Sequence, residues 1–107
     1  MSRHAKSLAY ALDVLNLDKY KQYIDEIYLY GSCARMKQKY SSDVDLFLKV
    51  RKDTPQKVLL EMRRDVISIE EGLPEVEIKF SSTETFSSSS QFNDNIKMEG
   101  KLLWRRM

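Results

Sequence analysis

The sequence has 107 residues, of which 42% are hydrophobic and 32% are charged, and its formal net charge is +2 at pH 7. A chain of this length has room for one core, so we expect a single domain over residues 1–107, and the small net charge gives no reason to expect nucleic acid as a partner. One cysteine and one histidine exclude an internal disulfide framework, a cysteine-rich zinc site and a conventional serine–histidine triad.

Residues 2–17 show apolar side chains at three- and four-residue spacing, which predicts an amphipathic helix that covers one face of a sheet. Asp18 is a candidate cap for a second short helix that carries Tyr20, Tyr23 and Ile24. Residues 25–30 alternate and favour β-structure, so they predict the first strand.

Gly31 follows this strand and allows a sharp turn from the strand into a short helix. Backbone N–H groups at such a turn, with the Ser32 hydroxyl beside them, can hold phosphate oxygens. Arg35 lies close by in the sequence, where a phosphate contact and a structural salt bridge are equally open. The neighbouring Lys37 and Lys39 fit a solvated loop.

Asp43 and Asp45 belong to the next predicted strand, residues 43–50. Side chains two residues apart on a strand share a face, with Cα atoms roughly 6.5–7 Å apart, so the two carboxylates can hold a divalent metal between them. The alternate residues Val44, Leu46 and Leu48 give the opposite face an apolar surface to bury. A phosphate site next to a metal site indicates a nucleoside triphosphate.

The second half of the chain predicts a helix, a strand and a short closing segment. Thr54 as a cap and Pro55 at the first helical position start the helix, and Gly72 ends it. Its apolar stripe consists of Val58, Leu59, Met62, Val66 and Ile69. Residues 75–80 alternate strictly, which places Glu75, Glu77 and Lys79 on one face of a strand.

The remaining residues predict a loop and a final helix. The serine-rich residues 81–90 predict a mobile loop before that helix, which is marked by Phe92, Ile96 and Met98 and ends at Gly100. Residues 104–107, which include Arg105 and Arg106, fit a solubilising chain end, with a clamp for RNA or protein as the alternative.

The central stretch resembles the minimal nucleotidyltransferases of the DNA polymerase β-like superfamily, whose signature is Gly-Ser, ten residues and Asp-x-Asp. Here Gly31, Ser32, Asp43 and Asp45 occupy the signature positions, and the intervening ten are residues 33–42. Met36 departs from the glycine that is usual in the family. The closing residues 96–104 also resemble the end of these small domains, in which a helix ending in Glu-Gly precedes a short apolar strand.

The resemblance implies a third acid on a neighbouring strand. Glu77 fits that position, Glu75 is its rival, and many minimal members have aspartate there. By the resemblance, Asp43, Asp45 and Glu77 are catalytic and bind two Mg²⁺ ions, while Gly31, Ser32 and Arg35 hold the phosphates of ATP or another nucleoside triphosphate. The implied reaction transfers a nucleoside monophosphate, AMP by first choice, to a hydroxyl group.

The resemblance also implies a partner. Minimal members commonly pair with a small helical HEPN-domain protein in a toxin–antitoxin module, so we expect an antitoxin that adenylylates its partner. The alternatives are a non-catalytic binding module that neutralises a partner by complex formation and, least favoured by the small net charge, RNA-end modification.

The fold expected from these elements is a mixed α/β (α+β) domain, with a small mixed β-sheet packed against helices as in the polymerase β-like nucleotidyltransferases. No apolar run approaches the ~20 residues of a membrane span, so we expect no membrane partner. The polar start, residues 1–4, lacks a following signal-peptide core, which makes the cytoplasm the expected location.

Overall fold

The computed structural model describes residues 2–31, 43–68, 70, 72–82 and 100–106. Its elements in chain order are α1 (Arg3–Leu15), α2 (Asp18–Lys21), β1 (Ile24–Tyr30), β2 (Val44–Val50), α4 (Gln56–Asp65), β3 (Val76–Ser82) and β4 (Lys101–Arg105). Within the described residues, no helix has the length and apolar character needed to cross a membrane.

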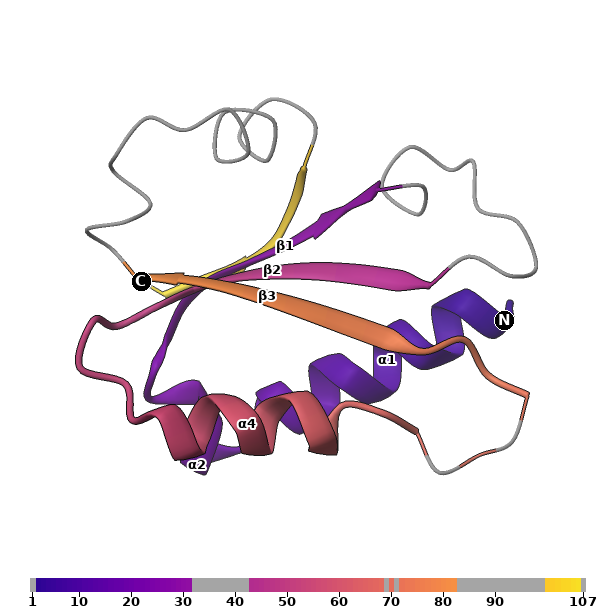
Figure 1. Ribbon diagram of the computed structural model, residues 1–107. Helices are drawn as coiled ribbons and strands as arrows, with labels where there is room; N and C mark the ends of the chain where they lie inside the picture. The colour runs from indigo at the N-terminus through magenta and orange to yellow at the C-terminus, as the bar shows by residue number, and fades with distance from the viewer. Residues whose placement is uncertain (1, 32–42, 69, 71, 83–99, 107) are drawn as a thin grey trace.

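The strands form one mixed sheet in the order β3-β2-β1-β4. β1 runs antiparallel to β2 and β4, whereas β2 and β3 are parallel. Helices α1, α2 and α4 all lie on one face of this sheet (Figure 1). The predicted mixed sheet with helices packed against it is therefore confirmed.

The main core lies between this helix layer and the sheet. On β2 the side chains of Val44, Leu46 and Leu48 are at most 1% exposed, as the alternation of that strand predicted. α1 and α4 supply buried partners to the same core, among them Ala11, Leu15, Met62 and Val66. Because Val44, Leu46 and Leu48 face the helices, the alternate residues Asp45 and Phe47 point to the face away from the helices.

Several predicted boundaries are wrong. Ile24 does not belong to the second helix, which ends at Lys21, because Ile24 pairs with Val50 as the first residue of β1. The N-cap of α2 is Leu17, so Asp18 lies in the first helical turn instead of capping it. Pairing with residues 49 and 50 of β2 also extends β3 to Ser82, into the region predicted as a loop.

The helix α4 differs from its prediction at both ends. The Thr54 hydroxyl donates to the carbonyl of Arg51 at 2.6 Å, so it does not cap the helix, and Pro55 is the N-cap. The helix ends at Asp65 with Val66 as its C-cap, although Val66 is fully buried as the apolar stripe predicted. Ile69, residues 83–90 and the predicted helix with Phe92, Ile96 and Met98 lie outside the described residues.

Residues 104–106 are built into the fold, so the expectation of a merely solubilising chain end is wrong for them. Trp104 pairs with Ile27 and packs against the core. Arg105 donates from Nε to Glu26 Oε2 at 2.7 Å. The guanidinium of Arg106 donates to the carbonyls of Lys21 and Ile24, and its backbone N–H donates to the carbonyl of Asp25 at 2.8 Å. The short strand predicted before the chain end is confirmed as β4.

Candidate active site

A row of polar side chains crosses the sheet on the face away from the helices. In the sheet register Asp45 of β2 pairs with Tyr30 of β1 on one side and with Glu77 of β3 on the other. Paired residues on neighbouring strands point to the same face, and neighbouring strands lie about 4.7–4.9 Å apart. The two acids predicted on separate strands are thus brought side by side.

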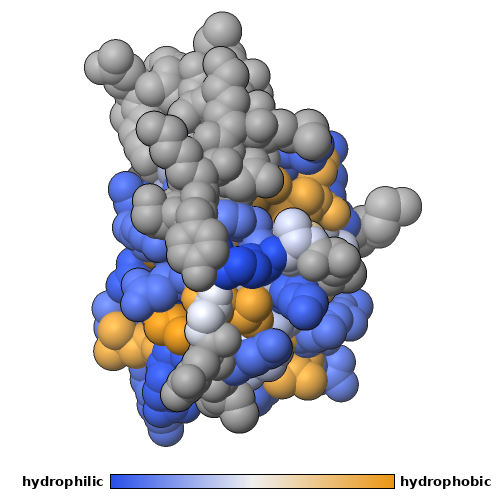
Figure 2. Space-filling model, turned by 90° about the vertical axis from the view of Figure 1, so that its right-hand side faces the viewer, coloured by the Kyte–Doolittle hydropathy of each residue, from blue (hydrophilic) through white to orange (hydrophobic). Residues whose placement is uncertain are grey.

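Asp43 directly precedes β2, two residues before Asp45, and its side chain is exposed. Its position at that spacing places it on the same face as Asp45. Asp45 itself is half-buried, whereas Glu77 is exposed. Figure 2 looks onto this end of the sheet, where hydrophilic residues occupy most of the visible described surface and apolar areas are separated from one another.

The electrostatics of the row show how close these acids are. Burial raises the pKa of Asp45, and the charges of Glu77 and Asp43 raise it further, while Lys79 acts in the opposite direction. Burial and the charges of Asp45 and Glu77 raise the pKa of Tyr30 to about 12. Tyr30 therefore remains protonated at neutral pH, and the negative charge at this end is concentrated on the carboxylates.

Gly31 follows Tyr30 and lies against Asp45. Its φ of +74° falls in the left-handed region, which L side chains rarely adopt. A Cβ placed on Gly31 would lie 2.6 Å from Asp45 Oδ2, closer than real carbon–oxygen contacts. The backbone conformation therefore favours glycine at this position, and a larger residue would also displace the Asp45 carboxylate.

The described residues include only part of the predicted site. Gly31, Asp43, Asp45 and Glu77 are described, whereas Ser32, Arg35 and the rest of the spacer to residue 42 lie outside the described residues. Between the two candidates for the third acid, Glu77 is the register partner of Asp45. Glu75 precedes β3, and its carbonyl accepts a hydrogen bond from the N–H of Val44 at 2.9 Å.

The donor chemistry of this end fits a hard divalent cation, because carboxylate oxygens are the ligands that Mg²⁺ prefers. Burial is the main cause of the raised pKa of Asp45, the like charges of Glu77 and Asp43 raise it further, and a bound cation would relieve their repulsion. Among the side chains that the structure describes, no three His, Cys, Asp or Glu residues are arranged as a ready-made metal site. The residues therefore fit the ion by their chemistry and their common face.

Tyr30 and Lys79 were not predicted as members of this site. Tyr30 was read as an ordinary strand residue, although its place directly before Gly31 is a signal that could have been used. Lys79 shares a face with Glu77 and lowers the pKa of Asp45. Its position two residues after the third acid was visible in the strand alternation.

Gly31, with its left-handed φ, thus lies against an Asp-x-Asp strand, and a further acid lies on the parallel neighbour of that strand. The family model described as polymerase beta, nucleotidyltransferase, matches residues 14–107. The chain therefore belongs to the polymerase beta nucleotidyltransferase family. Among curated proteins, none matches the sequence significantly.

Solved structures are similar to this chain in fold. One, described as a toxin-antitoxin with AMP-PNP, has a TM-score of 0.60 and 20% identity, covering 94% of this chain and 73% of its own. A mutant of the toxin-antitoxin MntA-HpeT has a TM-score of 0.57 and 18% identity, with coverages of 99% and 75%. A putative nucleotidyltransferase from Sulfolobus solfataricus has a TM-score of 0.52 and 19% identity, with coverages of 94% and 87%.

Proposed function

We propose that this chain transfers AMP from ATP to a hydroxyl group of a HEPN-type partner protein and acts as the antitoxin of a toxin–antitoxin module. The observation that carries the proposal is the register of Asp45 with Glu77 on parallel strands, next to Gly31. The acids that this register brings together are the ones that we propose as metal ligands. The family match supports transfer of a nucleotide, and we further propose that ATP is the donor.

In this proposal Asp43, Asp45 and Glu77 hold Mg²⁺. The bound ion supplies positive charge for the triphosphate and lowers the pKa of an attacking hydroxyl. Asp45 lies deepest of the three and fixes the position of the site relative to the sheet, since it is half-buried between Tyr30 and Glu77. The exposed Glu77 is available to accept the proton of the acceptor hydroxyl.

Gly31, Ser32 and Arg35 are the proposed contacts to the β- and γ-phosphates. Gly31 lies directly beside Asp45, so a phosphate bound at Gly31 would also lie next to the acids. A protein partner is supported by two of the similar structures, which are described as toxin-antitoxin proteins. One of these is described with AMP-PNP, which supports ATP as the nucleotide.

The test is a transfer assay with the protein encoded by the adjacent reading frame. The chain, that partner, cellular RNA, Mg²⁺ and ATP labelled on the α-phosphate are incubated, and label on the partner and on the RNA is measured. Wild type should label the partner, whereas Asp45→Asn should reduce the initial rate by at least about 100-fold, equivalent to about 2.7 kcal/mol. Label on RNA instead would identify a different acceptor.

Lys57→Gln is the matched control, because it changes one exposed charge on α4, across the sheet from the acids. Its rate should equal that of wild type. If neither protein nor RNA is labelled with any divalent metal, while the partner still binds, the non-catalytic binding module replaces the enzyme. Equal labelling by wild type and Asp45→Asn would exclude Asp45 from the chemistry.

A further inference from the structure

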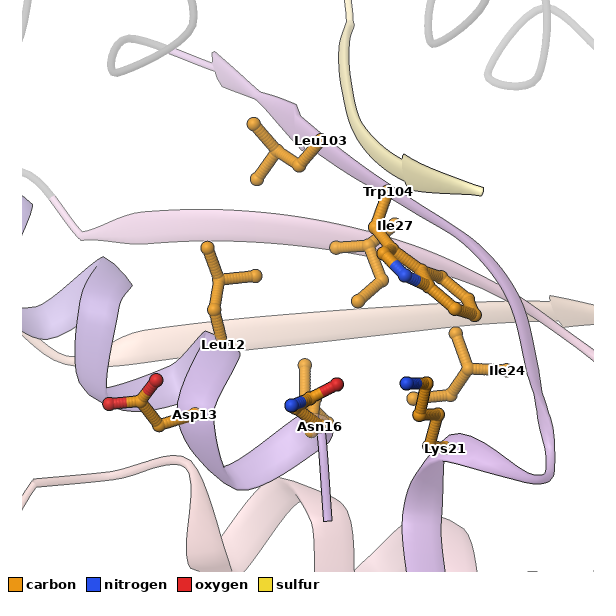
Figure 3. Close-up of a pocket in the computed structure, with 9 residues that line it drawn as sticks. Leu12, Asp13, Asn16, Lys21, Ile24, Ile27, Leu103 and Trp104 are labelled. Atoms are coloured by element: carbon orange, nitrogen blue, oxygen red, sulfur yellow. The ribbon is translucent and has the colours of Figure 1, made fainter. Parts of the chain in front are cut away.

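A second concave surface lies on the helix side of the sheet, away from the acids. A groove of about 260 Å³ separates α1 from the edge strand β4. Figure 3 shows residues from α1, α2, β1 and β4 around it. Its apolar lining consists of Leu12, Leu15, Ile24, Ile27, Leu103 and Trp104.

α1 lines one side of this groove with Leu12 and Leu15, and β4 lines the other with Leu103 and Trp104. Leu15 and Ile24 at the bottom of the groove are 1% exposed, whereas Leu103 and Trp104 are only partly buried. An apolar side chain entering here would therefore cover Leu103 and Trp104 and contact a floor that is already buried. The groove can thus hold one apolar side chain of a bound partner.

The rim on one side of the groove is positively charged. Lys21 Nζ lies 6.0 Å from the centroid of the Trp104 ring, and the Arg106 guanidinium carbon lies 5.9 Å from it. Arg106 also pairs with Asp25, at 3.5 Å between Nε and Oδ1. Within the part of the chain that is described, Lys21 has no ion pair, so its charge is available to a ligand.

Uncharged donors and one acid complete the rim. Figure 3 shows Asn16 beside Lys21, and it shows the indole nitrogen of Trp104 on the side of the ring that faces Leu12 and Asn16. Ammonium, amide and indole groups can all donate hydrogen bonds to a carboxylate. Asp13 lies farther along α1, with its carboxylate pointing away from Trp104. An occupant with one acid would therefore place it at the Lys21 end.

We propose that this groove docks a peptide segment of a partner protein in which an apolar anchor residue lies next to an acidic residue. The anchor fills the space between Leu12 and Trp104, and the acid meets Lys21. A second copy of this chain is a poor occupant, because Lys101 and Arg105 are exposed on the edge strand and Lys21 lies beside it, so two such edges would repel.

This inference rests on the proposed function only in assuming a protein partner, and its test uses no nucleotide. Random nonapeptides displayed on phage are selected against the whole chain and then synthesised. Their binding is followed by fluorescence of Trp104, which is the single tryptophan of the sequence. Enriched peptides should carry Asp or Glu within two residues of a large apolar residue, and they should shift the Trp104 emission.

Lys21→Glu should weaken these peptides by about 10-fold or more, since an ion pair becomes a repulsion. Changing the peptide's acid to lysine should restore binding to Lys21→Glu. Lys57→Glu is the matched control, because it makes the same charge change on α4 outside the groove, and it should bind like wild type. Trp104→Phe is a second variant, for use if larger changes impair folding, because it keeps an aromatic ring in the groove. It lacks the tryptophan whose fluorescence reports binding, so peptide binding to it is measured by fluorescence anisotropy of the peptide.

Three results would overturn the inference. Selection could yield no peptide, the peptides could lack the acidic neighbour, or they could bind Lys21→Glu as tightly as wild type. None of these results affects the transfer assay. Likewise, an inactive chain that still binds the peptides would reject the proposed transfer and leave the groove's role intact.

Discussion

Two carboxylates on the same face of the same sheet have opposite surroundings. Glu26, near one end, is 7% exposed and receives hydrogen bonds from Arg105 at 2.7 Å and from the Tyr28 hydroxyl at 3.1 Å. Lys49 Nζ lies 3.5 Å from its other oxygen. Asp45, at the other end, is paired in register with Glu77 and shares its face with Asp43.

The pKa values of the two acids shift in opposite directions. Burial alone would raise the pKa of Glu26, but the hydrogen bonds from Arg105 and Tyr28 and the charge of Lys49 lower it below its ordinary value. Burial and the neighbouring acids raise the pKa of Asp45. Glu26 is thus neutralised by the protein itself, whereas Asp45 belongs to a group whose charge a ligand can neutralise.

Gly31→Ala should have the largest effect, because it changes both the backbone conformation at residue 31 and the position of the Asp45 carboxylate. The left-handed φ costs about 1–2 kcal/mol for a non-glycine residue, and displacing the Asp45 carboxylate adds a smaller amount, so the unfolding free energy should fall by about 2–3 kcal/mol. Transfer activity should fall as well, since Asp45 must move. Denaturant unfolding and the transfer assay measure the two losses.

Gly72→Ala separates the two contributions. Its φ of +84° is equally unfavourable for alanine, but nothing lies within 4 Å of the added Cβ. It should therefore show only the backbone cost of about 1–2 kcal/mol. In the double variant Gly31→Ala with Asp45→Ala the excess should disappear. If Gly31→Ala costs no more than Gly72→Ala, the contact with Asp45 is unimportant.

Glu26→Gln should have the next largest effect, through stability alone. It leaves Arg105 and Lys49 facing a neutral amide, and lost hydrogen bonds to charged groups cost about 2 kcal/mol, or about 10 °C in Tm. Transfer activity per folded molecule should be unchanged. Thermal unfolding gives the first value and the assay gives the second. A loss of activity without a loss of stability would mean that the two ends of the sheet are not independent.

Asp45→Asn should have a smaller effect of the opposite sign on stability. Removing a like charge from a cross-strand pair should raise the unfolding free energy at pH 7 by up to about 1 kcal/mol. The two variants thus remove one negative charge each from the same face and should move Tm in opposite directions. A fall in Tm for Asp45→Asn without metal would show that its charge is compensated within the chain.

The pH dependence follows from the direction of each shift. The folded state holds the Asp45 proton at pH values where the unfolded chain, with the ordinary pKa of 3.8, has released it. The penalty from Asp45 therefore appears as pH rises from the unfolded pKa through the raised folded pKa, and it is complete above both. Glu26 behaves inversely: its contribution is present above its ordinary pKa of 4.5 and is lost as pH falls through the lowered one.

The acids of the candidate site could largely be predicted from the sequence, because their positions depend on local periodicity. The alternation of residues 43–50 and 75–80 assigns Asp45 and Glu77 to the faces opposite the apolar residues of their strands without knowledge of the whole fold. The Gly-Ser and Asp-x-Asp spacing added the resemblance to a family. The resemblance implied that the two strands are neighbours, and the structure adds their parallel register, in which Asp45 pairs with Glu77.

The surroundings of Glu26, at the other end of the sheet, could not be predicted in the same way. Glu26 and Arg105 are separated by 79 residues, and nothing in the local pattern around either one indicates the other. Arg105 and Arg106 therefore looked like a charged chain end. Their partners follow from the antiparallel pairing of β4 with β1, which is a long-range feature of the topology.

Addition of Mg²⁺ should have the smallest effect and should act on one end only. A ligand that binds the folded state stabilises it by RT ln(1 + [L]/Kd), or about 0.4 kcal/mol when the free ion equals its Kd. Mg²⁺ should thus raise the Tm of wild type and of Glu26→Gln by about the same small amount, and the rise should increase with concentration. Asp45→Asn should show no such rise, since it lacks the acid around which the others are grouped. A rise in Asp45→Asn equal to that of wild type would place the ion elsewhere, and the unequal surroundings of Glu26 and Asp45 would then be a matter of stability alone.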